Sequence, residues 1–252
     1  MQTKVRIARQ FSQAAHCYDQ LAEVQWQIGV DAVSQVTPTS GMLLDIGSGT
    51  GRISALLADK SGQVIGLDLA EGMARFASRT QPNKAGFLVG DADNLPFADN
   101  VFDYVFSCMA LQWCQPISQA FSEVARVMKP GAKGLLAMMV QGSLQELHRC
   151  WQAVGQPAHV NHFLSLETLE QAAKQVGLTW QVQTRLYQTW HTSLRDALHS
   201  IKDIGAGVVL NPTRSPLSKA VIQAVERRYF ENYQQQGLVP VSYQVAFMEI
   251  QK

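Results

Sequence analysis

A turn of three alternating glycines constrains this 252-residue chain more than any other feature. An apolar run and an acid, Asp45, precede Gly47, Gly49 and Gly51, and an amphipathic run follows over 52–58. The first run is typical of a buried strand and the second of a helix. Glycines tolerate positive φ and carry no Cβ, so such a turn presents bare backbone to a ligand where the helix begins. The sequence therefore predicts a small-molecule cofactor at this turn.

The chain begins with a predicted helical stretch over 4–36, which ends at a cluster of helix-breaking residues over 37–41. Strand and helix signals then alternate along the rest of the first half of the chain. Strands are predicted over 42–46, 64–67, 87–90, 101–107 and 134–140, and helices over 52–58, 72–78 and 118–127, the last ending at 129–131. This alternation predicts βαβ units and a parallel sheet. The strands are largely apolar, which indicates helices on both faces of the sheet.

The rhythm changes after residue 141. Helices are predicted over 143–153, 166–176, 194–201 and 216–233, and strands over 179–187 and 241–250. The stretch over 142–235 is too long for a loop and is interpreted as a largely helical lobe over the ligand end of the sheet. We expect four parts: an N-terminal helical segment over the cofactor site (1–40), an α/β core (41–141), a substrate or lid lobe (142–235) and a C-terminal strand completing the sheet (236–252).

Composition excludes several functional classes. The formal net charge is +1, which gives no global case for nucleic-acid binding. No apolar run approaches the ~20 residues that a membrane span needs. The N-terminus has no apolar secretory core, and the four cysteines show no Cys-x-x-Cys spacing and no visible zinc-ligand cluster. We expect a monomeric cytoplasmic protein with free thiols and without a metal, nucleic-acid or membrane partner.

Two further acids end the second and third predicted strands. Asp68 lies about twenty residues beyond the turn, where a carboxylate accepts hydrogen bonds from ribose hydroxyls, although it could instead cap the helix from Glu71. Asp91 and the backbone of Ala92 could contact an adenine ring. A surface turn without a ligand would explain an acid at this position equally well. Ser107 ends the fourth strand and is expected to face the cofactor from across the cleft.

These residues together resemble the class I S-adenosylmethionine-dependent methyltransferases. The spacing Gly-x-Gly-x-Gly behind an acid differs from the Gly-x-Gly-x-x-Gly of dinucleotide-binding folds, which must cradle a pyrophosphate. The resemblance implies a Rossmann-like, mostly parallel seven-stranded sheet with helices on both faces and a helical lid lobe, and S-adenosyl-L-methionine as cofactor. The cofactor-binding residues that it implies are Asp45, Gly47, Ser48, Gly49, Gly51, Asp68, Leu69, Met73, Asp91, Ala92 and Ser107.

Two of these positions, Ser48 and Met73, have features of their own. Ser48 stands where many family members have cysteine, but the contact there is mainly through the backbone. Met73 matches the apolar residue that packs on adenine, and packing in the core is the alternative role.

Segments outside the cofactor core are similar to the malonyl-acyl-carrier-protein O-methyltransferases of biotin synthesis. They are residues 11–18, 109–114, 139–151, 161–164 and 201–206. The resemblance runs over nearly the whole chain. It implies methylation of the free carboxylate of a malonyl thioester, giving the methyl ester that primes pimeloyl synthesis for biotin. Malonyl-acyl carrier protein is the expected substrate and partner, with malonyl-CoA as the alternative carrier.

Three residues are candidates on the substrate side. A carboxylate is already ionised and needs no general base, so alignment with the methyl donor is the main requirement. Lys202 or Arg195 could pair with the malonyl carboxylate, and Tyr18 could close over the methyl donor or serve only in helix packing. An excess of basic residues over 185–228, Arg214 among them, could steer an acidic carrier protein, but solvated helix faces explain it equally.

The same sequence features leave two other functions open. A methyltransferase of the same fold acting on a quinone or another small molecule is the first alternative. A non-catalytic nucleoside-binding module is the second, and the intact acids and glycines argue against it. A nicotinamide dehydrogenase is disfavoured because its glycine spacing is absent.

Overall fold

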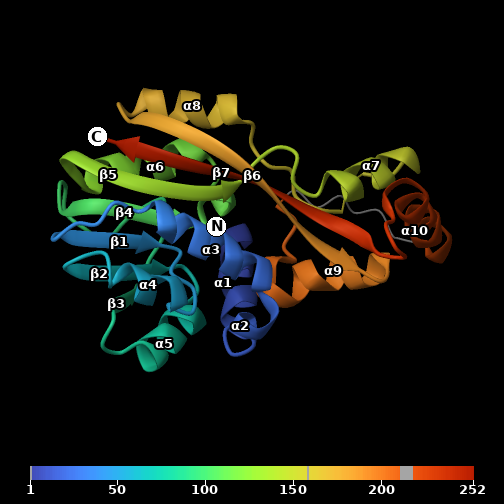
Figure 1. Cartoon of the computed structure of the whole chain (residues 1–252), viewed down its shortest axis with the longest axis horizontal. Helices are drawn as coiled ribbons and strands as arrows, with labels where there is room; N and C mark the ends of the chain where they lie inside the picture. The colour runs from blue at the N-terminus through green and yellow to red at the C-terminus, as the bar shows by residue number, and fades with distance from the viewer. Residues whose placement is uncertain (1, 158, 211–217) are drawn as a thin grey trace.

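The computed structural model of the protein describes residues 2–157, 159–210 and 218–252. Its centre is a seven-stranded sheet in the order β3-β2-β1-β4-β5-β7-β6 (Figure 1). The strands are β1 (Met42–Ile46), β2 (Gln63–Asp68), β3 (Gly86–Val89), β4 (Phe102–Cys108), β5 (Met128–Met139), β6 (Thr179–His191) and β7 (Val239–Gln251). The first five strands pair in parallel and β7 is antiparallel to both of its neighbours. The predicted α/β fold is confirmed.

Ten α-helices connect and cover the strands in the described part of the chain. They are α1 (Gln2–Ala14), α2 (Tyr18–Leu21), α3 (Glu23–Gln35), α4 (Arg52–Leu57), α5 (Glu71–Thr80), α6 (Ile117–Val127), α7 (Gln145–Ala153), α8 (Leu166–Gln175), α9 (Leu194–Ile201) and α10 (Lys219–Tyr233). The helical stretch predicted over 4–36 is divided into three, because Cys17 and Ala22 interrupt it; Ala22 leaves the helical region at φ −94° and ψ 49°. None of the described helices is long and apolar enough to cross a membrane.

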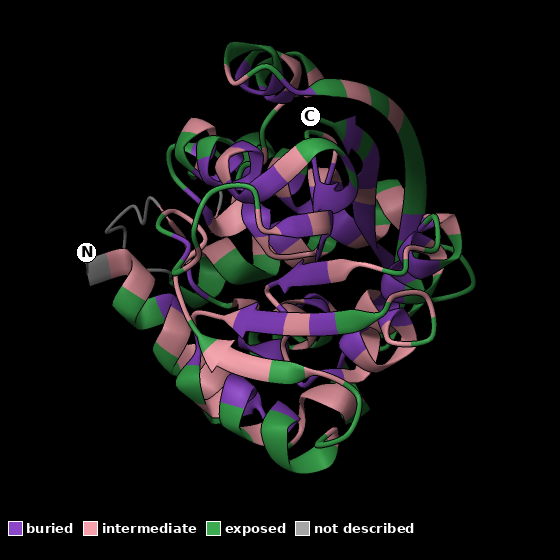
Figure 2. Ribbon diagram, turned by 90° about the vertical axis from the view of Figure 1, so that its left-hand side faces the viewer, coloured by how far each residue is buried: buried purple, intermediate pink, exposed green. Residues whose placement is uncertain are grey.

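The sheet is buried on both faces, as its apolar strands predicted. Leu43 of β1 packs in a cluster with α3, whereas its neighbour Leu44 packs in a second cluster with α6 and α8. Alternate side chains of a strand point to opposite faces, so an unbroken apolar run fits a strand that is covered twice. Figure 2 shows the buried residues concentrated on the strands, with exposed residues on the outer sides of the helices.

The register places the carboxyl ends of the parallel strands at one edge. Asp45 pairs with Gly66 of β2, and Ile46 pairs with Ser107 of β4. The chain order reverses at β1, which lies between β2 and β4. In open α/β sheets this reversal point is where ligands bind, because the loops on its two sides diverge.

Strand β5 begins earlier than the sequence predicts. Residues 129–131 were expected to end a helix and lead to a strand from 134, but β5 already starts at Met128, which pairs with Phe102. A register shift between Phe102 and Tyr104 accommodates the additional residues. Pro130 is tolerated there because an irregularity in the ladder relieves it of donating a hydrogen bond.

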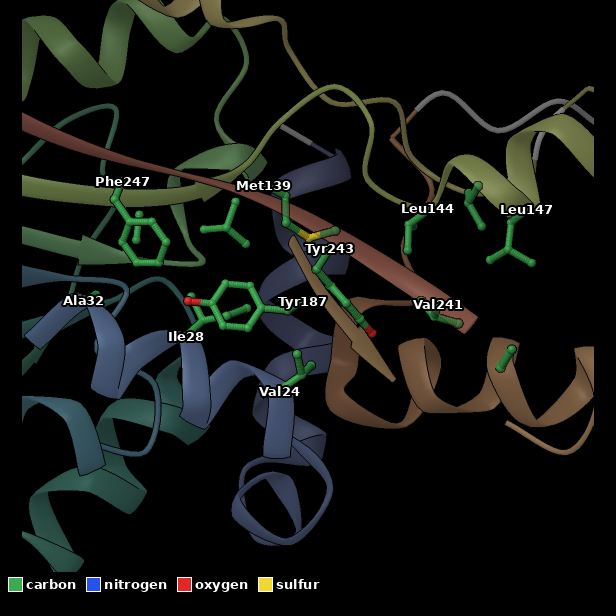
Figure 3. Packing of buried hydrophobic residues seen from close by; sticks show 14 of the residues in the cluster. Val24, Ile28, Ala32, Met139, Leu144, Leu147, Tyr187, Val241, Tyr243 and Phe247 are labelled. Atoms are coloured by element: carbon green, nitrogen blue, oxygen red, sulfur yellow. The ribbon is translucent and has the colours of Figure 1, made fainter. Parts of the chain in front are cut away.

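The last two strands run well beyond the rest of the sheet. β6 and β7 are 13 residues each, and α7, α9 and α10 surround their far ends (Figure 1). Figure 3 shows Tyr187 of β6 and Tyr243 of β7 beside Ile28 and Val24 of α3, in one continuous cluster. The range 142–235, predicted to be a largely helical lobe, therefore also contributes β6 to the central sheet.

The four-part division of the chain stays a prediction. The described part of the last predicted helix is α10, which begins at Lys219, and the predicted start at 216 lies outside the described residues. So does Arg214 of the basic stretch.

Candidate active site

Three neighbouring cavities open at the carboxyl edge of the parallel strands. Cavity A lies over the ends of β1 and β2 and is covered by α1. Cavity B lies between the glycine turn and helices α2 and α3. Cavity C extends from α2 to α9 and β7. Tyr18 and Met109 line all three, so the cavities meet at these two side chains.

The glycine turn forms the wall between cavities A and B. Gly47 has φ +79°, and a Cβ there would overlap the side chain of Ala110. Gly49 has φ +54°, and a Cβ there would point into open space. The amides of Gly47 and Ser48 both donate to the Leu67 carbonyl, at 2.7 and 3.0 Å, which fixes the turn against β2. Gly47 and Gly49 line both cavities, so the turn presents bare backbone to each of them.

Asp68 braces this turn from the end of β2. Its Oδ2 accepts from the Gly49 amide at 2.9 Å and its Oδ1 accepts from the Ala70 amide at 2.7 Å. Burial raises the pKa of Asp68 to about 6, and the two amide donors act in the opposite direction. Asp68 lines cavity A together with Leu69 and Met73. Its carboxylate retains lone pairs for ribose hydroxyls, because two oxygens accept about four hydrogen bonds.

Asp91 carries an ion pair that the sequence did not predict. Lys4 of α1 places Nζ 2.6 Å from Asp91 and 2.5 Å from Asp93. Lys4, Asp91 and Ala92 all line cavity A. Asp91 also bridges to Asn94 in a tight turn, so the acid belongs both to a turn and to the wall of the cavity. Lys4 lies in a basic N-terminal stretch without any motif, and the contact joins residues 87 positions apart in the chain.

Cavity B contains the acid that precedes the glycines. Asp45 is 2% exposed, and its Oδ2 accepts a hydrogen bond from Ser54 at 2.5 Å. Burial raises the pKa of Asp45 to about 7, against the effect of the Ser54 bond. Ser48 also lines this cavity. Its hydroxyl is buried without a hydrogen-bond partner among the described residues.

Two of the predicted cofactor residues line none of the three cavities. Gly51 packs beside Phe87, at the point where α4 begins. Ser107 is 1% exposed, and its hydroxyl donates to the Ile46 carbonyl at 2.8 Å, which ties β4 to β1 beneath the site. The structure brings the other nine predicted cofactor residues together around cavities A and B.

The junction of the cavities is aromatic and sterically constrained. Phe11 lies with its ring centroid 6.4 Å from Tyr18 and 5.8 Å from Trp113, between cavities A and C. Burial, followed by the nearby Cys108 and Asp68, raises the pKa of Tyr18, so its hydroxyl stays protonated at neutral pH. Met109 holds φ +57°, a left-handed conformation that is uncommon for a residue with a side chain and typical of functional sites.

Of the two basic residues predicted to bind the substrate, one lines cavity C and the other does not. Lys202 lines it and is the one lysine or arginine among the described residues that do so. Arg195 is exposed on α9 and lines none of the three cavities. The remaining walls are mainly apolar, with polar groups from Tyr18, Gln25, Gln112, His159, Asn161 and Tyr243. No group of three or more histidine, cysteine or acidic side chains in the described ranges is arranged to hold a metal.

The arrangement suits transfer between two bound molecules. A ligand with one end in cavity A and the other in cavity B must place its centre beside Tyr18 and Met109. A second molecule in cavity C would meet that centre at the same two side chains. Such alignment is the principal requirement of an in-line displacement.

Comparisons with known proteins agree with this geometry. The family described as "Methyltransferase domain" matches residues 44–136. The YcgJ protein from Bacillus subtilis superposes with a TM-score of 0.64 at 19% identity, covering 89% of this chain and 97% of that one. Phosphoethanolamine N-methyltransferase 2 from Haemonchus contortus, in complex with S-adenosylhomocysteine, gives a TM-score of 0.56 at 22% identity, covering 90% and 53%. These likenesses confirm the class I methyltransferase fold.

Curated relatives cover nearly the whole chain. The biotin biosynthesis bifunctional protein BioHC of Cellvibrio japonicus is 38% identical over 99% of this chain, which spans 50% of that protein's length. Malonyl-acyl-carrier-protein O-methyltransferases of Methylococcus capsulatus and Yersinia pestis are 32% and 34% identical, over 96% and 97% of this chain and 91% and 90% of theirs. At this identity and coverage, the chain belongs to the malonyl-acyl-carrier-protein O-methyltransferase family.

Proposed function

We propose that the protein transfers a methyl group from S-adenosyl-L-methionine to the free carboxylate of a malonyl thioester, with malonyl-acyl carrier protein as the substrate. One observation carries the assignment of the acceptor. Four segments that resemble this family in sequence, over 109–114, 139–151, 161–164 and 201–206, each contribute residues to the wall of cavity C. Segments scattered through the chain thus converge on the cavity that faces the cofactor.

In this reaction the residues of the chain position the two substrates and do not transfer a proton. A carboxylate oxygen of the malonyl group forms a bond to the methyl carbon while the sulfur–carbon bond breaks and its electron pair stays on sulfur. The products are a neutral ester and S-adenosylhomocysteine, so no proton has to move and no general base is required. Tyr18 and Met109 border the reacting centre, and the protonated Tyr18 hydroxyl can donate a hydrogen bond there.

Lys202 is proposed to orient the malonyl carboxylate from the wall of cavity C. A cation that bonds the attacking oxygen lowers its nucleophilicity, so the geometry that favours reaction leaves one carboxylate oxygen facing the methyl group. Arg195 lies outside the cavity wall and is better suited to the approach of an acidic carrier protein.

The test offers isotopically labelled S-adenosylmethionine to the protein together with malonyl-acyl carrier protein, malonyl-CoA, free malonate and acetyl-acyl carrier protein. We expect label on the malonyl thioesters that is released by base, and none on the acetyl thioester, which has no free carboxylate. Label on the acetyl thioester, or only on a quinone or another small acceptor, would contradict the proposal. Monomeric action in the cytoplasm stays a prediction, which light scattering and cell fractionation test.

A further inference from the structure

We propose that Asn161 is a positioning residue for the substrate, because its side chain fixes the segment over 207–210 against Lys202. The inference rests on the proposed role of Lys202 in orienting the malonyl carboxylate. Asn161, Lys202, Gly207 and Val209 all line cavity C. They come from two separate parts of the chain, and the side chain of Asn161 joins these parts in the wall of the cavity.

The side-chain amide of Asn161 makes two hydrogen bonds to the backbone of this segment. Its Nδ2 donates to the Val208 carbonyl at 2.8 Å, and its Oδ1 accepts from the Leu210 amide at 2.8 Å. An amide carries a donor and an acceptor side by side, so it matches a carbonyl and an N–H of one backbone segment. The two bonds fix the backbone on both sides of Val209, which lines cavity C.

Asn161 is itself held by helix α7. Its backbone carbonyl lies 2.9 Å from Nε2 of His148, and a carbonyl can only accept, so Nε2 carries the proton in this bond. Burial lowers the pKa of His148, which favours the neutral ring. The ring centroid of His162 lies 4.2 Å from that of His148 and restricts its movement. Asn161 therefore links the segment over 207–210 to α7, which packs on the central sheet.

The segment over 207–210 packs on the base of the Lys202 side chain. A Cβ at Gly207 would lie 3.0 Å from Cγ and 3.3 Å from Cα of Lys202, so the bare backbone of Gly207 contacts the aliphatic stem. Among the described residues, no hydrogen bond or ion pair holds the Lys202 ammonium. A lysine side chain has several rotatable bonds, and contact along its stem restricts the positions that the ammonium can reach. Loss of the Asn161 bonds should therefore release Lys202.

A double-mutant cycle tests whether Asn161 acts through Lys202. We expect Asn161→Ala to lower kcat/KM for malonyl-acyl carrier protein about three- to tenfold, since two hydrogen bonds are lost. The affinity for S-adenosylhomocysteine, measured by calorimetry, should stay within about twofold of wild type. In a Lys202→Met background, Asn161→Ala should lower kcat/KM by less than about twofold, because the positioned ammonium is already gone.

The opposite results are equally distinct. The same loss of kcat/KM in both backgrounds would show that Asn161 acts independently of Lys202 and would overturn the inference. A large loss of S-adenosylhomocysteine affinity in Asn161→Ala would point instead to general disruption of the fold.

Two further variants test the contact and control for the substitution. Gly207→Ala leaves both Asn161 bonds in place but presses a Cβ on the Lys202 stem, and it should lower kcat/KM without weakening S-adenosylhomocysteine. An unchanged kcat/KM in Gly207→Ala would contradict the role of the stem contact. Asn232→Ala removes an exposed side-chain amide that bonds to the Arg228 carbonyl of its own helix, α10, and should change neither quantity.

Failure of the inference is separable from failure of the proposed function. If Lys202→Met keeps the wild-type kcat/KM, the role of Lys202 falls, and that of Asn161 falls with it. If the wild-type protein labels no malonyl thioester, the proposed function itself is overturned.

Discussion

Asp68 accepts a hydrogen bond from the Gly49 amide at 2.9 Å, and this bond joins the end of β2 to the middle of the glycine turn. Its second oxygen accepts from the Ala70 amide, where α5 is about to begin. The carboxylate predicted to hold a ribose therefore also fixes the backbone that separates cavities A and B. One side chain thus shapes the sites for two parts of the same cofactor.

This double role predicts a graded effect of substitution at residue 68. Asp68→Ala removes every oxygen, and we expect S-adenosylhomocysteine to bind at least about tenfold more weakly, since hydrogen bonds to a charged group contribute about 1.5–3 kcal/mol. Asp68→Asn keeps one acceptor and should lose less. Calorimetry measures both, with Asp59→Ala as the control because Asp59 is exposed and pairs with Lys84, and neither residue lines one of the three cavities. Unchanged affinity in Asp68→Ala would remove Asp68 from the cofactor site.

The ion pair of Lys4 with Asp91 and Asp93 predicts that α1 controls release of the cofactor. The ion pairs of Lys4 hold α1 over cavity A, and the Ser12 hydroxyl of the same helix accepts a hydrogen bond from the Gly72 amide at 3.1 Å. We expect Lys4→Met to speed dissociation of S-adenosylhomocysteine several-fold in stopped-flow measurements, because the cover loses one attachment. Arg9→Met, an exposed change on α1, should leave the rate as it is. Equal rates in both variants would show that α1 is held without Lys4.

The buried carboxyl of Asp45 predicts a pH-dependent penalty on stability. Its pKa is about 7 in the folded protein against 3.8 for the free group. As pH rises from about 4 to 7, the unfolded chain loses this proton first, so the free energy of unfolding falls over that window. Asp45→Asn removes the penalty. Urea unfolding should show the variant gaining on wild type between pH 5 and pH 7.5 and keeping a constant advantage above that.

A matched variant controls for changes elsewhere in the titration. Asp59→Asn alters an exposed acid and should follow wild type at every pH. A difference between Asp45→Asn and wild type that does not change with pH would show that Asp45 has an ordinary pKa in the folded state.

We expect substitutions of Lys202 and Arg195, the two basic residues predicted to bind the substrate, to affect the KM to different extents. Lys202 lines cavity C, so Lys202→Met should raise the KM for malonyl-acyl carrier protein about tenfold and leave the affinity for S-adenosylhomocysteine unchanged. Arg195→Met should change the KM less at physiological salt, because Arg195 lines none of the three cavities and a surface charge away from the site contributes mainly to association and is screened. Steady-state kinetics with the carrier protein measure both. A KM unaffected by Lys202→Met would remove Lys202 from the carboxylate site.

Much of the fold and of the cofactor site follows from local sequence patterns. The alternating apolar runs predicted β1 with its observed bounds, because a strand covered on both faces leaves an uninterrupted signal. Gly47, Gly49 and Asp68 were predicted from spacing alone, because positive φ and strand ends are local properties of the chain. The early start of β5 was not predicted, since the pairing of Met128 with Phe102 joins separate parts of the sequence.

The sequence by itself determined the α/β order, the glycine turn and the acids at the strand ends, because each depends on a few neighbouring residues. Only the tertiary structure decided which distant side chains join them. Lys4 reaches Asp91, Arg52 stacks on Trp26, and Tyr18 lies where three cavities meet. The same folding placed Lys202 in a cavity wall and left Arg195 outside it. Such contacts arise when helices pack against the sheet, and no local pattern encodes the distances between them.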